Sequence, residues 1–362
     1  MIRFYVKYCR DRITHGVLGS SIPGLDSGFT GSSESRNERV RMQRSLIGLV
    51  APLFFCCLTP VFCQQLVATI AVGNQPIYLA VDEKRNLVYV SNQADDTVSV
   101  IDGATNTVLH TVRVGHAPNG VAVNQKTNTI YVANLNGESL SIINGTKLTT
   151  STVRLGPNPA KVAVNPSTNR VYVTLEERKG FLKVVDGKER KVEASIPLPP
   201  YPLSVAVDLE SNQVYVADFL CGCGQISVVD GNTNTVVNTI NVPGASLLEG
   251  VALDWKHDRA YATDENNGFY VIDPTTGTVL GQVSDLHYPN EVAAIPGTNL
   301  AVEPDTGSNH AVFIDAATLA IRKKVRVGKF PTGVAVNATT KRVYVANRHS
   351  NSVSVIQLLR SW

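Results

Sequence analysis

The sequence predicts an all-β protein, a seven-bladed β-propeller with four-stranded blades. Two columns of residues repeat with a period just above forty, which is typical of propeller blades rather than of helical solenoids. The first column is the alanine at the centre of a Val-Ala-Val-like triplet, at Ala80, Ala122, Ala163, Ala206, Ala252, Ala293 and Ala335. The second is a turn residue after a β-branched residue, at Asp102, Asn144, Asp186, Asp230, Asp273 and Asp315, with Gln357 as a degenerate seventh copy.

Each repeat unit contains four short β runs, named here strands A to D in chain order. Strand A is the Val-Ala-Val triplet, strand B an x-V-Y-V run, strand C an S-V-S-V-I run, and strand D a T-V-x-x-T-I-x-V-G run. β-branched and aromatic residues fill these runs, and Asn, Asp, Gly and Pro separate them. Such a blade is apolar on both faces and must stack on its neighbours, which seven blades around an axis permit.

The two ends of the repeat region predict how the ring closes. The seventh unit has strands A, B and C, but only six residues follow Ile356. The missing strand D pattern occurs at the other end of the repeats, in residues 66–73. We expect this N-terminal strand to pair with residues 353–356 and complete the last blade, because closure removes two exposed sheet edges. An open array of blades is the alternative.

Several short motifs recur across the units. They are Y-V-A-N at 131–134 and 344–347, Y-V-S-N at 89–92, V-S-V-I-D at 98–102, and V-G-x-x-P at 72–76 and 114–118. In these motifs the chain resembles the YVTN β-propeller repeat family, and the resemblance covers residues 66–357. Because that family occurs in prokaryotic secreted and surface proteins, the resemblance implies a secreted, periplasmic or cell-surface location. Blades 5 and 6 depart from the pattern at 261–264 and 300–303.

The region before the repeats predicts export. Met42 is followed by an apolar run over 46–58 and is flanked by Arg41 and Arg44, as in a secretory signal peptide. The run is too short for a stable membrane span. We therefore expect three parts: an unstructured upstream extension over 1–41, a signal peptide over 42–63, and a single propeller domain over 64–362. An unusually long signal-peptide n-region is the alternative for residues 1–41.

Export changes the charge balance. The whole chain has 33 Lys and Arg against 30 Asp and Glu, a net charge of +3. The leader through Cys63 holds 8 basic and 4 acidic residues, so the mature chain would carry 25 and 26. A nearly neutral ring has no bulk electrostatic attraction for nucleic acid, so no nucleic-acid partner is expected.

Variable positions at one end of the ring are the candidate ligand contacts. The loops from strand D to the next strand A and those from strand B to strand C share this end, named here the top face. Where three repeats have Gly just before the triplet (Gly120, Gly250 and Gly333), the others have Tyr78, Lys161, Ser204 and Glu291. The predicted ligand-binding residues are Tyr78, Asn119, Lys161, Tyr201, Tyr288, Asn290 and Phe330. Ordinary solvated loop residues are the alternative.

A second column lies at the end of strand B, at Asn92, Asn134, Leu175, Asp218, Asp264, Glu303 and Asn347. Asn and Asp at such positions commonly cap turns. The alternative is a hard-cation site, since Ca²⁺ takes six to eight oxygen ligands. Its candidate ligands are Glu249, Glu291, Asp218 and Asp264, with Glu303 as a further carboxylate.

Cys221 and Cys223 are the two cysteines outside the predicted leader. In an oxidising compartment we expect them to form a tight disulfide or to remain free thiols. Two thiolates that bind a soft metal are the alternative.

Three function classes remain. The sequence has no C-x-x-C-H, G-x-S-x-G, phosphate-binding Gly loop or H-E-x-x-H motif, so no cofactor is predicted. We therefore expect a monomeric binding scaffold for a protein or glycan partner, without catalysis. The alternative is a lactonase-like hydrolase in which Glu249 or Glu291 is the base and His287 its proton-carrying partner. Single-stranded nucleic acid stacked on the top-face aromatics is a weaker third hypothesis.

Overall fold

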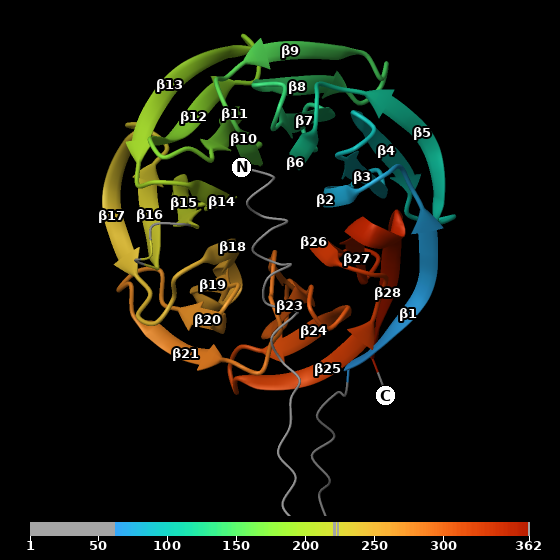
Figure 1. Cartoon of the computed structure of the whole chain (residues 1–362), viewed down its shortest axis with the longest axis vertical. Coiled ribbons are helices and arrows are strands. Elements are labelled where there is room, and N and C mark those ends of the chain that lie inside the picture. Colours follow the sequence, from blue (N-terminus) through green and yellow to red (C-terminus); the bar gives the residue numbers. More distant parts are fainter. Residues whose placement is uncertain (1–61, 220–221, 223, 361–362) are drawn as a thin grey trace, which may run out of the picture. The chain divides into compact units, whose positions relative to one another are not determined.

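The repeats form a ring of seven antiparallel sheets with four strands each, which confirms the predicted fold class. The structure is a computed structural model, and it describes residues 62–219, 222 and 224–360, without the side chains of 62, 63 and 360. In Figure 1 the strands A of blades 1 to 5 and 7 lie innermost, and strand D forms the outer edge of each blade. No helix among the described residues is long and apolar enough to cross a membrane.

The strands keep the predicted order within each blade. Blade 1 contains β2 (Pro76–Asp82), β3 (Leu87–Asn92), β4 (Thr97–Asp102) and β5 (Thr107–Arg113), and blade 2 contains β6 (Pro118–Asn124), β7 (Thr129–Asn134), β8 (Ser139–Asn144) and β9 (Thr150–Arg154). Blade 3 contains β10 (Pro159–Asn165), β11 (Arg170–Leu175), β12 (Gly180–Asp186) and β13 (Lys191–Leu198), and blade 4 contains β14 (Pro202–Val207), β15 (Gln213–Asp218), β16 (Gln225–Asp230) and β17 (Thr235–Asn241).

The remaining blades follow the same plan. Blade 5 contains β18 (Leu248–Asp254), β19 (Arg259–Asp264), β20 (Gly268–Ile272) and β21 (Val279–Val283), and blade 6 contains β22 (Ala293–Ala294), β23 (Leu300–Asp305), β24 (His310–Asp315) and β25 (Ala320–Arg326). Blade 7 contains β26 (Pro331–Asn337), β27 (Arg342–Asn347), β28 (Ser352–Arg360) and β1 (Phe62–Ala71). Two short 3-10 helices, η1 (Trp255–His257) and η2 (Arg348–Ser350), lie in connecting turns.

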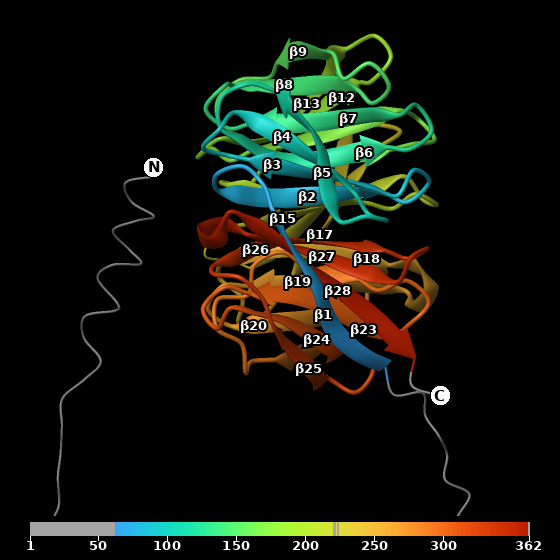
Figure 2. The same cartoon turned by 90° about the vertical axis from the view of Figure 1, so that its right-hand side faces the viewer.

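The N-terminal strand closes the ring, as predicted. Strand β1 pairs antiparallel with β28, with Leu66 opposite Ile356 and Ile70 opposite Val353. Figure 2 shows β1 beside β28 at the outer edge of the last blade. The strand begins at Phe62, two residues inside the range predicted for the signal peptide. The rest of that range, and the predicted extension over 1–41, lie outside the described residues.

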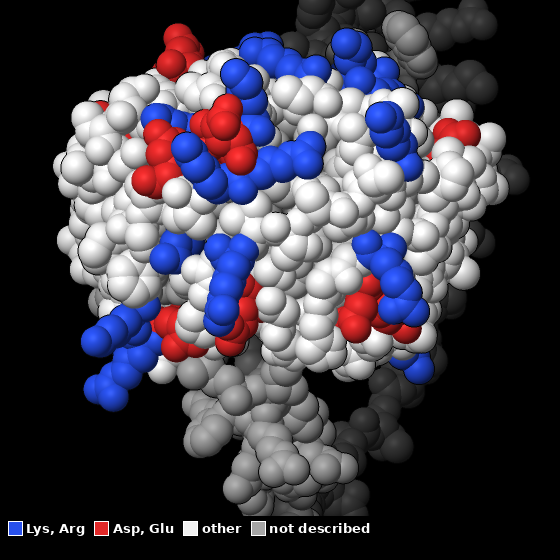
Figure 3. All heavy atoms as spheres, turned by 90° about the horizontal axis from the view of Figure 1, so that it is seen from above, with Lys and Arg blue, Asp and Glu red and all other residues white. Residues whose placement is uncertain are grey.

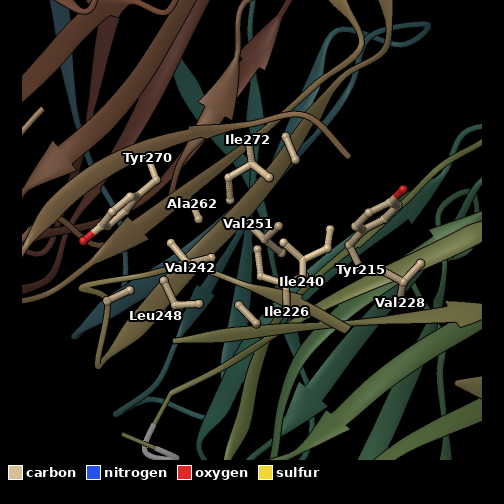
Figure 4. Packing of buried hydrophobic residues seen from close by; sticks show 13 residues of the cluster. Tyr215, Ile226, Val228, Ile240, Val242, Leu248, Val251, Ala262, Tyr270 and Ile272 are labelled. Atoms are coloured by element: carbon tan, nitrogen blue, oxygen red, sulfur yellow. The ribbon is translucent and has the colours of Figure 1, made fainter. Parts of the chain in front are cut away.

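Apolar side chains fill the space between neighbouring blades. Between blades 4 and 5, for example, Val228 and Ile226 pack with Val251 and Ile272. Figure 4 shows this cluster, in which the hydroxyl groups of Tyr215 and Tyr270 point away from the packed side chains. Because successive side chains in a strand alternate between its two faces, each inner strand contributes to both of its blade-to-blade interfaces.

A β-bulge at the top-face end of strand A is linked by hydrogen bonds to the neighbouring blade at the channel lip. In β2, for example, the register with β3 shifts by one residue between Pro76 and Leu79. Ladder pairing is lost there, and hydroxyl groups of neighbouring strands bond the freed backbone. Ser91 Oγ donates to the Asn119 carbonyl at 2.5 Å, which joins blades 1 and 2. Thr332 Oγ1 likewise donates to the Ile77 carbonyl at 2.7 Å, which joins blades 7 and 1.

Blade 6 departs most from the repeat, and the sequence-based alignment of its strand B was wrong. Strand β23 ends at Asp305, which forms a bridge with Pro289 just as Asn92 pairs with Pro76 in blade 1. Asp305 therefore takes the column position assigned above to Glu303. Glu303 lies two residues earlier, opposite Val312, at the place that Val90 and its equivalents hold in other blades. A two-residue slip preserves the alternation of faces, so the strand pattern did not reveal it.

Candidate functional site

Three of the predicted ligand-binding residues meet across the channel at the top face. Lys161 of blade 3 forms an ion pair with Glu291 of blade 6. The same Lys161 Nζ lies 3.3 Å from the centre of the Tyr78 ring of blade 1, a cation–π contact. The Tyr78 hydroxyl is 3.5 Å from Asn290 Oδ1. Residues far apart in the sequence thus bridge the mouth of the channel.

The electrostatics of this cluster are strongly perturbed. Burial lowers the pKa of Lys161, and the carboxylates of Glu291 and Glu249 oppose that shift. Burial also raises the pKa of Tyr78 well above its usual value, and Glu249, Glu291 and Glu176 raise it further. Since such shifts concentrate at functional sites, the channel mouth is the main candidate site.

Glu176 is a member of this cluster that the sequence analysis did not identify. It follows Leu175 in the loop between strands B and C of blade 3, and burial raises its pKa to about 7, with Glu177 adding to the shift. A carboxyl group with such a pKa is suited to proton exchange near neutral pH. The only signal in the sequence was its place next to the second column.

The space left beneath the cluster is small. A cavity of about 120 Å³ is lined by Tyr78, Lys161, Glu291 and Ser204, among others. Gly120 has no room for a side chain, because a Cβ there would meet the backbone of Lys161. The cavity is well below the 300–1,000 Å³ of typical ligand pockets. It suits water or one small polar group rather than a whole substrate.

The predicted aromatic residues lie on the D–A loops, outside the channel. Tyr201, Tyr288 and Phe330 all have left-handed backbones, with φ of 58°, 60° and 54°. The equivalent residues of blades 1, 2 and 3 are also left-handed, at Gln75, Ala117 and Asn158. The carbonyl of this residue accepts a bond from the B–C loop, as in Thr306 N to the Tyr288 carbonyl (3.1 Å). This hydrogen bond between the two loops thus requires a left-handed backbone at this position of the D–A loop.

The residues at this position of the D–A loops differ in how much a left-handed backbone destabilises them. An L-residue in the left-handed region is destabilised, and bulky side chains tolerate it less well than Asn or Gly. Tyr288 is nevertheless placed there with 44% of its surface exposed. Phe330 stacks on His349 of η2, with the ring centres 4.3 Å apart. Both aromatic side chains are therefore held on the top face at an energetic cost.

Asn119 and Asn290 lie on the channel lip. Asn119 is buried, and its Oδ1 has no hydrogen-bond partner within the described ranges. Asn290 uses its side chain toward Tyr78, and its carbonyl accepts a bond from the Thr263 hydroxyl. Asn119 and Asn290 directly precede Gly120 and Glu291, which line the cavity.

Most of the second column is structural. Asn92 Nδ2 donates to Thr97 Oγ1 and Ser99 Oγ at 3.0 and 2.9 Å, and Asn134 and Asn347 make the equivalent contacts with strand C. The Asp264 carboxylate accepts bonds from four backbone amides of its own and the preceding loop, those of Ser246, Leu247, Asn266 and Asn267. These contacts support the capping interpretation.

The alternative residues are dispersed. Over the described part of the chain, no three His, Cys, Asp or Glu side chains lie close enough to hold a metal ion. Glu249, Glu291, Asp218 and Asp264 therefore do not come together as a cation site. Glu291 is paired with Lys161, and the His287 ring lies beside Asp305, Nδ1 being 3.6 Å from Oδ2. Cys221 and Cys223 lie outside the described residues, so their predicted disulfide is untested.

The comparison with known sequences is partial. No family model matches the chain. The chain is similar to the proteins named "Uncharacterized protein YncE" of Salmonella typhi and Salmonella typhimurium, at 28% identity over 148 residues. The match covers 38% of this chain and spans about two fifths (41%) of the length of these relatives. The resemblance to the YVTN family thus remains a prediction.

The comparison with known structures supports the fold. A chain of Kuenenia stuttgartiensis hydrazine synthase superimposes with a TM-score of 0.72. The match covers 79% of this chain and 96% of that chain at 18% sequence identity. At this identity the likeness concerns the propeller architecture alone and carries no information on activity.

Proposed function

We propose that this chain is an exported β-propeller scaffold that binds a protein or glycan partner through its top-face loops, without catalysis. The observation that carries the proposal is the placement of Tyr201, Tyr288 and Phe330 at the left-handed position of three D–A loops. Such a position costs about 1–3 kcal/mol for a non-glycine residue. Large aromatic side chains are retained there although smaller residues occupy it in blades 1 to 3.

Aromatic residues on a rigid frame are effective recognition groups, because they provide a large contact area and lose little side-chain entropy on binding. The loop backbone fixes the position from which these side chains extend, which lowers the entropic cost of association. The charged cluster of Lys161, Glu291 and Tyr78 lies at the centre of the same face. A partner would therefore meet three aromatic side chains outside a polar centre.

The test is a comparison of variants in a pull-down from the envelope fraction and on a glycan array. The mature chain should retain a specific protein or glycan, and a Tyr201→Ala, Tyr288→Ala, Phe330→Ala variant should lose it. The matched control is Leu280→Ala on β21, a side chain that is 53% exposed. Retention of the same partner by the aromatic triple variant would overturn the assignment of the surface.

A lactonase-like hydrolase is the second candidate, and one observation favours it. Burial raises the pKa of Glu176 to about 7 at the channel mouth, where an acid or base would act. Elemental analysis and a lactone-hydrolysis screen test it directly. Turnover that disappears in Glu176→Gln or Glu291→Gln would establish the enzyme, whereas an inert wild-type protein would exclude this candidate for the lactones tested.

A further inference from the structure

A second groove lies away from the top face. It has a volume of about 350 Å³ and lies between blades 4 and 5, at the opposite end of the strands, named here the bottom face. The turns from strand A to B and from strand C to D form this face. The volume falls within the range of small-molecule sites, about 300–1,000 Å³.

The groove exists because blade 5 departs from the repeat at its C–D turn. In blades 3 and 4 this turn has Gly187 and Gly231, and a side chain at either would collide with a tyrosine hydroxyl of the preceding blade. Blade 5 has Pro274 at the same place, and Pro274 lines the groove. The Tyr215 hydroxyl instead bonds to Gln213 Oε1 of its own strand at 3.1 Å. Figure 4 shows this hydroxyl pointing away from the packed cluster.

A second departure places a tryptophan at the edge of the groove. Trp255 occupies the A–B turn of blade 5, where the other blades have Glu83, Gln125, Pro166, Leu209, Pro296 and Ala338. Trp255 is one of two tryptophans in the chain, and 43% of its surface is exposed. An exposed indole beside a polar groove provides an apolar face with one hydrogen-bond donor.

The polar groups of the groove differ in how far they are already engaged. Asp254 accepts bonds from His257 Nδ1 at 2.9 Å and the Tyr261 hydroxyl at 2.8 Å. Asp208 caps its own turn by accepting the Glu210 and Ser211 amides. By contrast, Arg259 Nη1 is buried at the groove and has no hydrogen-bond partner among the described residues. A buried guanidinium donor without a partner indicates a missing acceptor.

We propose that this groove binds a neutral sugar, with one face of the sugar ring stacked on Trp255 and its hydroxyl groups bonded to Arg259 and Asp258. A sugar hydroxyl both donates and accepts, so it satisfies the Arg259 donor and the exposed Asp258 carboxylate together. Three aspartates line the groove, Asp208, Asp254 and Asp258, and they disfavour an anionic ligand such as a uronate. The orphan Arg259 donor disfavours a purely cationic one.

The site is separate from the proposed top-face surface. It is built from A–B and C–D turns, whereas Tyr288 and Phe330 belong to D–A loops at the other end of the strands. Binding at the bottom face therefore neither requires nor excludes recognition at the top face. A scaffold that holds a sugar here could be anchored to a glycan while its top face remains accessible.

The test uses the tryptophan as its own reporter. In the full chain with Trp362→Phe, Trp255 is the one remaining tryptophan. Its fluorescence is titrated with glucose, galactose, N-acetylglucosamine and their β-1,4-linked disaccharides, and calorimetry measures the affinity. We expect a saturable change with at least one of these sugars, and binding at least tenfold weaker for glucuronate than for glucose.

Two variants localise the site. Trp255→Ala should abolish the calorimetric signal, and Arg259→Gln should weaken binding at least tenfold while the thermal midpoint and near-UV spectrum show a folded protein. Leu209→Ala in the neighbouring turn and Leu280→Ala on β21 are the controls and should bind as the parent does. The proposal is overturned if none of the sugars perturbs Trp255, if glucuronate binds best, or if Arg259→Gln binds normally.

Discussion

Replacing Glu303 with valine should stabilise the propeller, and more so as the pH rises. Glu303 is fully buried in β23, and neither of its carboxylate oxygens has a hydrogen-bond partner among the described residues. Burial raises its pKa well above the usual 4.5, Asp305 adds to the shift and Lys324 opposes it. The equivalent position in other blades holds Val90, Val132 and Val345, which are fully buried in the core.

The magnitude has two parts. A buried polar group without a partner costs about 1–3 kcal/mol, and a small cavity left by the shorter valine offsets about 0.5–1.5 kcal/mol of the gain. We thus expect a gain of about 1 kcal/mol at pH 4, where Glu303 is largely protonated in both states. Above that pH the unfolded chain releases the proton and the folded chain retains it. The gain should then grow by about 1.4 kcal/mol per pH unit until the folded-state pKa is reached.

The assay is urea denaturation of wild type, Glu303→Val and Glu303→Gln at pH 4, 6 and 8. The glutamine variant keeps the shape and polarity but cannot ionise, so it should remove the pH dependence and retain part of the cost at pH 4. A gain that is the same at all three pH values would refute the argument. So would a loss of stability in Glu303→Val at pH 8, because it would mean that the carboxylate has a stabilising partner.

Three further predictions follow from individual contacts. Asp218→Asn should stabilise the fold above pH 4, because burial raises the Asp218 pKa from 3.8 to about 7. The stability of the wild type should accordingly fall by up to about 4 kcal/mol as the pH rises from about 4 to 7. A flat wild-type profile in urea titrations would contradict this. Lys161→Met should cost about 3–5 kcal/mol because it leaves Glu291 without its cation. The Lys161→Met, Glu291→Gln double variant should recover part of that loss, and strict additivity in the cycle would show that the pair is not coupled. Tyr288→Gly should leave stability unchanged or raise it by about 1 kcal/mol, because glycine tolerates the left-handed backbone, while partner binding is lost. Ala117→Gly, at the same loop position of blade 2, should show the stability effect alone in thermal unfolding.

Both signs of charge occur on the surface of the propeller. On the face seen in Figure 3, several Lys and Arg side chains gather over the upper part, some of them beside Asp and Glu, with uncharged surface between the groups. Ion pairs such as Arg322–Asp315 (2.6 Å) and Lys324–Asp285 (3.3 Å) bring opposite charges together on outer strands. Such pairs on the surface contribute little stability, about 0–1 kcal/mol each.

The fold was predictable because the evidence for it is local and repeated. Each strand and each turn can be recognised from a few consecutive residues, and so can the strand D pattern at 66–73. The pairing of that strand with β28 confirmed the predicted closure. The columns also identified Tyr78, Lys161 and Glu291 as residues of one rim. The contact between Lys161 and Glu291 could not be read from the sequence, since it joins positions 130 residues apart across a channel whose width depends on backbone packing.

Besides Glu176, two features outside the candidate site were missed for identifiable reasons. Glu303 was placed in the wrong column because a two-residue shift preserves the strand alternation, and only the pairing of Pro289 with Asp305 reveals the true end of β23. The groove beside Trp255 forms because Pro274 leaves no room for the Tyr215 hydroxyl at the C–D turn of blade 5. To predict this groove, one must know how blades 4 and 5 are placed relative to each other, and aligned sequence positions do not give that information.

The most direct test of the proposed top-face recognition is photo-crosslinking in the cells that produce the chain. A photoreactive phenylalanine replaces Tyr288 on the top face or, as the control, Leu280 on an outer strand. The proposed function predicts a discrete adduct from position 288 and none from position 280. An exported, folded protein that gives no adduct at 288, or the same adducts at both positions, would contradict recognition through the top face.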